Sequence, residues 1–235
     1  MNVDVQRRLH ESALPYARHA RYVELMTPQA REPMILMPAR CALGHFPTRV
    51  ELREQMSHQL SIAPLWVKRD DLACAAYGGS KVRKLELELA RAQAVNSDTI
   101  VTAGSAGSHH LIATARLAGG RGLQVHCLVK PRHADDVVRR NLLLTHAAGA
   151  QLHACTERTA TRSNAATVRR LMSELQAAGR RPYFIPFGGG STLGSAAFVA
   201  AGFELAAQIR RHELPRPDRI YLAAASGGSS AGLVV

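Results

Sequence analysis

The chain has 235 residues, of which 30 are Lys or Arg and 18 are Asp or Glu, so its formal net charge at pH 7 is +12. An apolar fraction of 46% and a charged fraction of 20% are typical of a globular protein and exclude a wholly disordered chain. We find no unbroken apolar run of the roughly 20 residues that a membrane-spanning helix needs, and we expect no secretory signal.

The positive charge comes from 26 arginines and only 4 lysines, which are scattered along the chain without a run of five basic residues. Aromatic residues make up 5% of the sequence, so the charge indicates a general attraction to anions rather than nucleic-acid recognition. The four cysteines lie far apart and form no CxxC pair, which argues against a metal site. We therefore expect a cytoplasmic protein with reduced thiols that binds neither nucleic acid nor a membrane.

The N-terminal residues 1–43 mix charges, prolines and short apolar pieces, and we expect a peripheral arm there. Further along, strand-like and helix-like segments alternate. The predicted strands are residues 65–67, 99–103, 123–129, 151–155, 181–187 and 219–225. The predicted helices are residues 80–95, 110–117, 135–148, 160–178 and 193–211.

This alternation predicts an α/β protein with doubly wound, mainly parallel sheets and helices on both faces. The last predicted strand is followed by a Gly/Ser-rich loop, and the chain ends where the next helix should begin. A buried parallel strand needs that helix as cover, so we expect the chain to be an incomplete unit with an exposed apolar last strand.

Three loops at predicted strand or helix ends offer candidate binding groups. The first is the turn Gly78–Gly79 followed by Lys81, Arg83 and Lys84, three cations at a helix start, where the helix dipole disfavours positive charge. Either these side chains point into water, or an anionic partner or carbonyl chemistry holds one of them. No Walker A motif is present.

The second loop runs from residue 104 to residue 110 and contains Ser108 and His109. Adjacent His109 and His110 point to different sides of a helix, so they are a poor metal pair. The third loop has the composition of a phosphate cradle made of backbone N–H groups and hydroxyls. It consists of Ser226, Gly227, Gly228, Ser229, Ser230, Ala231 and Gly232.

These loops together resemble a known family. Residues 67–72, VKRDDL, and 78–86, GGSKVRKLE, resemble the signature K-R-D-D-L…G-G-N-K-x-R-K-L-E of the D-cysteine desulfhydrase and 1-aminocyclopropane-1-carboxylate deaminase family. That family belongs to the tryptophan-synthase-β-like enzymes, the fold-type II enzymes that depend on pyridoxal phosphate. Residues 102–110, 185–194 and 225–233 resemble further blocks of the same family in the same order.

The resemblance implies roles for the loops. Lys81 stands where the family lysine binds pyridoxal phosphate covalently, and neighbouring Arg83 and Lys84 would lower its pKa. Ser108 stands where the substrate carboxylate is contacted, His109 replaces the asparagine that contacts the cofactor ring oxygen, and residues 226–232 stand where the phosphate is held. Ser80 and Gly107 also depart from the family pattern.

The resemblance implies a lyase of amino-acid metabolism that converts a small amino acid to a 2-oxo acid and ammonia, and a homodimer if the protein is complete. It also implies two lobes: the larger, incomplete one formed by residues 44–85 and 184–235, and the smaller by residues 86–183. Family members continue past Val235, so we expect little turnover from these 235 residues alone. The alternatives are a truncated, inactive remnant of such an enzyme, or an unrelated α/β protein that binds an anion or nucleotide.

Overall fold

The computed structural model of the chain describes residues 37–155, 161–223 and 227–234. Residues 40–235 form one compact unit, separate from residues 1–39. The arm predicted at residues 1–43 thus falls mostly outside the described residues, and the predicted division into two lobes stays a prediction.

The centre of the fold is a four-stranded sheet in the order β5-β4-β3-β6, in which every neighbouring pair is parallel. Its central strand β3 is buried along its length up to Gly104, as a strand covered on both faces should be. The parallel α/β class predicted from the sequence is confirmed. The four strands are β3 (Thr99–Ser105), β4 (Gln124–Lys130), β5 (Gln151–Ala154) and β6 (Pro182–Ile185).

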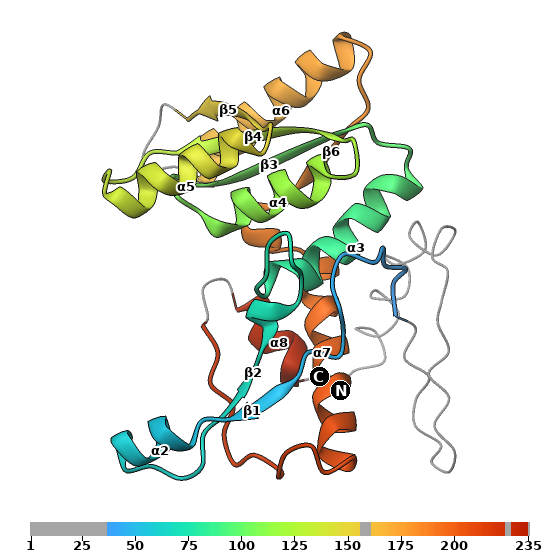
Figure 1. The fold of residues 1–235 in the computed structure, drawn as a ribbon. Coiled ribbons are helices and arrows are strands. Elements are labelled where there is room, and N and C mark those ends of the chain that lie inside the picture. The colour runs from blue at the N-terminus through green and yellow to red at the C-terminus, as the bar shows by residue number, and fades with distance from the viewer. Residues whose placement is uncertain (1–36, 156–160, 224–226, 235) are drawn as a thin grey trace, which may run out of the picture. The chain divides into compact units, whose positions relative to one another are not determined.

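Helices cover both faces of this sheet, with α4 (His109–Gly119) and α5 (Asp136–Ala147) on one face and α6 (Thr161–Ala177) on the other (Figure 1). One buried cluster joins apolar residues of α4 to β3 and β4, and a second joins α6 to the opposite face of the same strands. Each strand and helix between residues 99 and 185 lies within two residues of its predicted bounds. The central strands β3 and β4 are continuous buried runs, as strands covered on both faces should be.

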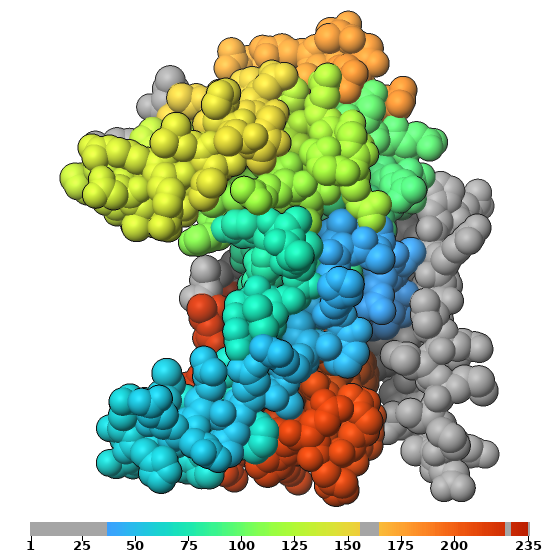
Figure 2. Space-filling model, viewed as in Figure 1, coloured from blue at the N-terminus to red at the C-terminus, as the bar shows by residue number. Residues whose placement is uncertain are grey.

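Three further helices pack on one another: α3 (Lys81–Ala94), α7 (Thr192–Arg210) and the short α8 (Gly228–Val234). Leu87 of α3 and Phe198 of α7 form a buried cluster, against which Leu233 of α8 packs. A hairpin of β1 (Val50–Leu52) and β2 (Trp66–Lys68), with α2 (Glu54–Leu60) between its strands, pairs antiparallel. Figure 2 shows this hairpin, in blue to cyan, against the orange-red α7. The sequence pattern predicted β2 but not β1 or α2.

The predicted strand at residues 219–225 is not a strand where the structure describes it, at residues 219–223. The side chains of Ile220, Tyr221 and Leu222 are 52%, 79% and 37% exposed. Apolar and β-branched residues form a strand where a neighbouring strand supplies hydrogen-bond partners, and this segment pairs with no described strand. Residues 224 and 225 lie outside the described residues.

One helical stretch of the described residues, Phe187–Arg210, is long and apolar enough to cross a membrane by length and composition. The core helix of a soluble protein passes the same test. Here Glu204 and Gln208 lie on this helix and bind cationic side chains of the hairpin and of α3. We interpret the stretch as a helix that packs against α3 and the hairpin for that reason, with 28% of its apolar window buried.

Candidate active site

The strand order reverses direction beside β3, since β4 and β5 follow on one side and β6 lies on the other. In open α/β sheets, ligands bind beyond the carboxyl ends of the strands at such a reversal. Two loops leave the sheet there, residues 106–108 after β3 and residues 186–191 after β6. This edge of the sheet is therefore where a site is expected, and the loop that contains Ser108 and His109 lies at it.

The turn before Lys81 has a backbone that only glycine fits. A Cβ on Gly78 would lie 1.7 Å from the carbonyl oxygen of Asp71, and Gly79 has a φ of +100°, in the region that side chains disfavour. The N–H of Gly79 donates to the carbonyl of Asp70 at 2.7 Å. The two glycines thus hold the turn tightly against the 3-10 turn Asp70–Leu72 and fix where α3, and Lys81 as its first residue, begins.

Arg83, the second cation of this turn, is an ion-pair residue of the core. Its guanidinium donates to Asp70 Oδ1 at 2.7 Å and to Glu204 Oε2 at 2.8 Å, and its side chain is only 5% exposed. Burial opposes the charge, but these hydrogen bonds raise the pKa of Arg83. Lys68 pairs with the same Glu204 at 2.5 Å. The interpretation that these cations point into water is wrong for Arg83, because its charge is balanced inside the protein.

Lys84, the third cation, is also buried. It is 4% exposed, and its ammonium lies 5.5 Å from the centre of the Phe198 ring. The loop after β6 covers it, since a Cβ on Gly189 would lie 3.2 Å from Lys84 Cδ. Burial, and after it the charge of Lys81, lower the pKa of Lys84. The glycine loop at residues 188–190 therefore packs against the Lys84 side chain and helps to bury it.

Lys81 differs from most charged residues of the signature. It is half-buried, and its ammonium makes neither a hydrogen bond nor an ion pair with any other described residue. Burial lowers its pKa. We expected Arg83 and Lys84 to contribute to that shift, and this is wrong, because burial alone lowers the pKa of Lys81. The charge of Arg83 is neutralised by Asp70 and Glu204. A half-buried amine with a lowered pKa and no counter-ion is the form that a lysine needs for carbonyl chemistry.

The loop after β3 places Ser108 and His109 at the start of α4. Ser108 caps the helix, and its Oγ accepts from the N–H of His110 at 3.2 Å. The loop is anchored by Asn141 of α5, whose amide donates to the Gly107 carbonyl at 2.8 Å. His109 is exposed and His110 is buried, so the prediction that the two histidines point to different sides is confirmed.

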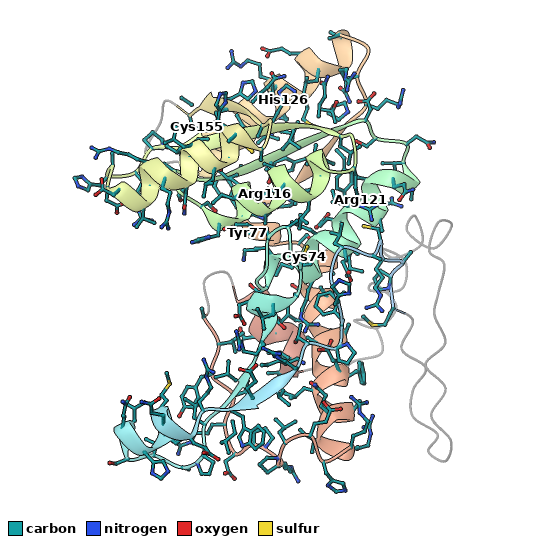
Figure 3. The ribbon with its side chains drawn as sticks, viewed as in Figure 1. Cys74, Tyr77, Arg116, Arg121, His126 and Cys155 are labelled. Atoms are coloured by element: carbon teal, nitrogen blue, oxygen red, sulfur yellow. The ribbon has the colours of Figure 1, made fainter. Side chains whose placement is uncertain are left out.

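Tyr77 is a candidate that the sequence analysis missed. Its hydroxyl contacts His109 Nδ1. Arg116 of α4 donates to the carbonyl of Ala76 at 3.2 Å and holds the same segment. Figure 3 shows Tyr77, Cys74 and Arg116 together, where this segment passes α4. These contacts join the Lys81 turn to the loop of Ser108 and His109. A tyrosine directly before the Gly-Gly turn was the available signal.

The third candidate loop is only partly described, because Ser226 lies outside the described residues. Gly227 has a φ of +81°, and the Ser230 hydroxyl donates to its carbonyl at 2.8 Å. Gly232 packs on α7, where a Cβ would lie 2.4 Å from the Ser195 carbonyl oxygen. The phosphate cradle of residues 226–232 stays a prediction. No hydrogen bond or ion pair among the described residues links it to Lys81 or Ser108.

His110 makes stability depend on pH. Burial, and then the charges of Lys81 and Lys84, lower the pKa of His110 to about 3, and burial also lowers the pKa of His126 and of His153. In the unfolded chain these histidines have pKa values near 6.5 and bind protons below that pH, whereas in the folded chain they stay neutral. Stability is therefore full above about pH 6.5 and falls as the pH drops toward 3.

We expect the free energy of unfolding in urea to fall by about 1.6 kcal/mol from His110 alone between pH 6.5 and pH 5, with a slope that approaches about 1.4 kcal/mol per pH unit below the unfolded-state pKa. His126 and His153 add to the fall. A His110→Gln variant should show a shallower slope over the same interval. Equal unfolding free energies at pH 7 and pH 5 in the unsubstituted protein would contradict this expectation.

Comparison with known proteins identifies the family to which the chain belongs. The model of a family described as pyridoxal-phosphate dependent enzyme matches residues 42–235. The chain belongs to this family, and the fold-type II architecture expected from the resemblance is confirmed.

Several relatives are more specific. The chain is 40% identical over 167 residues to nocardicin C-9' epimerase of Nocardia uniformis subsp. tsuyamanensis, covering 71% of this chain and 50% of that one. It is 32% identical to the mitochondrial bifunctional D-cysteine desulfhydrase/1-aminocyclopropane-1-carboxylate deaminase of Arabidopsis thaliana, covering 82% and 49%. It is 33% identical to D-cysteine desulfhydrase of Salmonella paratyphi B, covering 80% and 57%. The chain thus spans about half the length of these relatives.

Among solved structures, an ACC deaminase homologue superposes with a TM-score of 0.70 at 29% identity, over 83% of this chain and 57% of that one. A threonine deaminase of T.th. superposes with a TM-score of 0.59 at 20% identity, over 79% and 53%, and shares the fold. The residues around Lys81 fit the family's cofactor, since an unpaired amine at a rigid turn is what a covalently bound aldehyde requires. These matches do not favour the alternative of an unrelated anion- or nucleotide-binding protein.

Proposed function

We propose that Lys81 binds pyridoxal phosphate covalently and that the protein converts a small amino acid to a 2-oxo acid and ammonia. The observation that carries the proposal is the state of Lys81. It is half-buried and has no described counter-ion, although neighbouring Arg83 and Lys68 are paired. Pyridoxal phosphate, when bound, supplies an electron sink for negative charge that develops at the substrate Cα.

In the proposed site, further residues bind the substrate and the cofactor, and Lys81 can also act as a base. The Ser108 hydroxyl accepts from the helix backbone, so its own proton is free to donate to a substrate carboxylate. His109 offers its Nε2 toward the cofactor ring oxygen, since its Nδ1 is engaged by Tyr77. Residues 226–232 hold the phosphate. When Lys81 is not bonded to the cofactor, its amine, with a pKa lowered by burial, is more often unprotonated near neutral pH than that of an exposed lysine and can act as a base.

The proposal includes the substrate class, the cellular compartment and the oligomeric state. D-cysteine plus water would give pyruvate, ammonia and hydrogen sulfide, and 1-aminocyclopropane-1-carboxylate plus water would give 2-oxobutanoate and ammonia. The relatives named for these reactions support this class of substrate. We place the enzyme in the cytoplasm and as a homodimer, without a nucleic-acid or membrane partner.

Epimerisation at Cα is the second candidate, favoured by the 40% identity to an epimerase. It shares with deamination of D-cysteine the removal of the Cα proton and differs in the later fate of that carbon. An epimerase returns a proton to the opposite face of the same carbon and releases no ammonia. Lys81 serves both reactions, so the described geometry of that residue does not separate them.

One experiment separates the candidates. The 235-residue chain, loaded with pyridoxal phosphate and in excess over substrate, is incubated in D2O with D-cysteine, 1-aminocyclopropane-1-carboxylate or either enantiomer of serine. Because a single conversion is then detectable, low turnover does not hide the reaction. Formation of a 2-oxo acid supports the deaminase, and deuterium at Cα of an inverted amino acid supports the epimerase. Neither product from a folded, loaded sample would overturn the proposed function.

A further inference from the structure

Tyr77 and His109 form a side-chain pair that joins the two loops of the candidate site. The hydroxyl of Tyr77 contacts His109 Nδ1, and the two ring centroids are 6.2 Å apart with a tilt of 34°. Neither side chain makes another hydrogen bond with a described residue. His109 is exposed. Its Nδ1 is thus occupied, whereas Nε2, on the other edge of the imidazole, is open to a ligand.

Both partners stand on backbone that the fold holds in place. Tyr77 directly precedes the Gly78–Gly79 turn, its ring packs against the largest buried apolar cluster, and Arg116 donates to the carbonyl of Ala76 at 3.2 Å. His109 is the first residue of α4. The hydroxyl and the imidazole are therefore held facing each other by two anchored segments.

The surroundings of Tyr77 fix the direction of this hydrogen bond. Burial raises the pKa of Tyr77, and the charges of Arg116 and Arg140 offset that rise only in part, so the phenol keeps its proton near neutral pH. Both arginines offer donors and no acceptor. His109 Nδ1 is therefore the acceptor for the Tyr77 proton. A neutral imidazole that accepts at Nδ1 carries its own proton on Nε2.

We propose that Tyr77 is a positioning residue that holds His109 in the tautomer with its proton on Nε2, so that His109 serves the site as a hydrogen-bond donor and not as a base. An amide at position 109 would offer an N–H without help. An imidazole offers one in every molecule only if a partner occupies Nδ1.

The inference rests on the proposed function and deepens it. Ser108, whose Oγ accepts from the helix backbone, has a hydroxyl proton to give. The loop after β3 thus presents two neighbouring donors, one of them aimed at the cofactor ring oxygen. Among the residues proposed for the site, this leaves Lys81 as the base.

The first test reads the tautomer in the cofactor-free protein. With isotope-labelled histidine nitrogens, long-range nitrogen–hydrogen correlation spectra at about pH 8.5, well above the ordinary histidine pKa of about 6.5, distinguish protonated from bare ring nitrogens. His109→Asn identifies the His109 signals by their loss. We expect the proton on Nε2. In Tyr77→Phe, which removes only the hydroxyl, the tautomers should mix and the two nitrogen shifts should move toward each other. Tyr221→Phe alters a tyrosine that is 79% exposed and is the matched control, in which the His109 shifts should not change.

The second test measures the affinity for pyridoxal phosphate by equilibrium dialysis in a double-mutant cycle. Tyr77→Phe should weaken binding about fivefold, because one hydrogen bond of about 1 kcal/mol is no longer made in every molecule. In the His109→Asn background, where the amide needs no partner, Tyr77→Phe should change the affinity by less than about twofold. Circular dichroism and cooperative unfolding establish that each variant is folded.

A proton on Nδ1 of His109 in the unsubstituted protein would overturn the inference, and this result does not depend on any variant that alters Tyr77. An affinity unchanged by Tyr77→Phe would also overturn it. So would equal losses with and without His109, because the hydroxyl would then act only through packing. A cofactor label on a lysine other than Lys81 would instead refute the proposed function and leave the tautomer of His109 standing.

Discussion

Replacing Arg83 with methionine is expected to lower the free energy of unfolding by about 3–5 kcal/mol. The substitution keeps most of the apolar volume but leaves Asp70 and Glu204 without their shared cation. Burial raises the pKa of Glu204, and only the hydrogen bonds and charges of Arg83 and Lys68 hold it below its ordinary value. Removing one partner of a buried ion pair is costly because the other charge stays buried and uncompensated. The loss is a large fraction of a typical domain stability of about 5–15 kcal/mol.

Arg139→Met is the matched control. Arg139 pairs with Asp136 at 3.1 Å, but their side chains are 67% and 97% exposed, and exposed pairs contribute about 0–1 kcal/mol. Adding Asp70→Asn to Arg83→Met should recover part of the stability, since it removes the carboxylate whose described ion pair is with Arg83, whereas Glu204 keeps its pair with Lys68. Urea unfolding of the three variants measures these differences. A loss below about 1 kcal/mol in Arg83→Met would mean that the pair contributes no more than an exposed one.

The second large effect concerns Lys81. Lys81→Ala should abolish retention of pyridoxal phosphate through dialysis, because the other lysines are held elsewhere or buried. Lys68 is bound by Glu204 and Gln208, and Lys84 is enclosed beneath Gly189. Stability should change little or rise, since a half-buried charge without a described counter-ion is removed. Lys130→Ala is the control and should retain the cofactor. Retention by Lys81→Ala equal to that of the control would refute the role of Lys81.

Much of the fold follows from the sequence because its strongest patterns are local. The central strands are short continuous apolar runs, and glycine follows several of the helices, as at Gly149 and Gly179. The hairpin strand β1 and helix α2 lack such a pattern and depend on pairing with β2. The segment at residues 219–223 shows the reverse case, where a strand-like composition has no described neighbour to pair with.

The sequence motifs predicted which residues belong to the site, but not which residues their side chains contact. The Gly-Gly turn and the resemblance together indicated Lys81. The neutralisation of Arg83 by Glu204 joins residues 121 positions apart, and no local pattern reveals such a pair. The same holds for the contacts of the Thr102 hydroxyl with His110 Nε2 and with the Ile185 carbonyl, which depend on β6 lying beside β3. The contact of Tyr77 with His109 likewise arises only when the two loops meet.

Every functional proposal above depends on Lys81 being the residue that carries pyridoxal phosphate. The decisive experiment is reduction of the cofactor-loaded chain with borohydride, which makes the bond between lysine and cofactor permanent, followed by proteolysis and mass mapping. We expect one cofactor-derived mass on the peptide that contains Lys81 and none on Lys68, Lys84 or Lys130. A label on any of those three in place of Lys81 would show that the assignment is wrong.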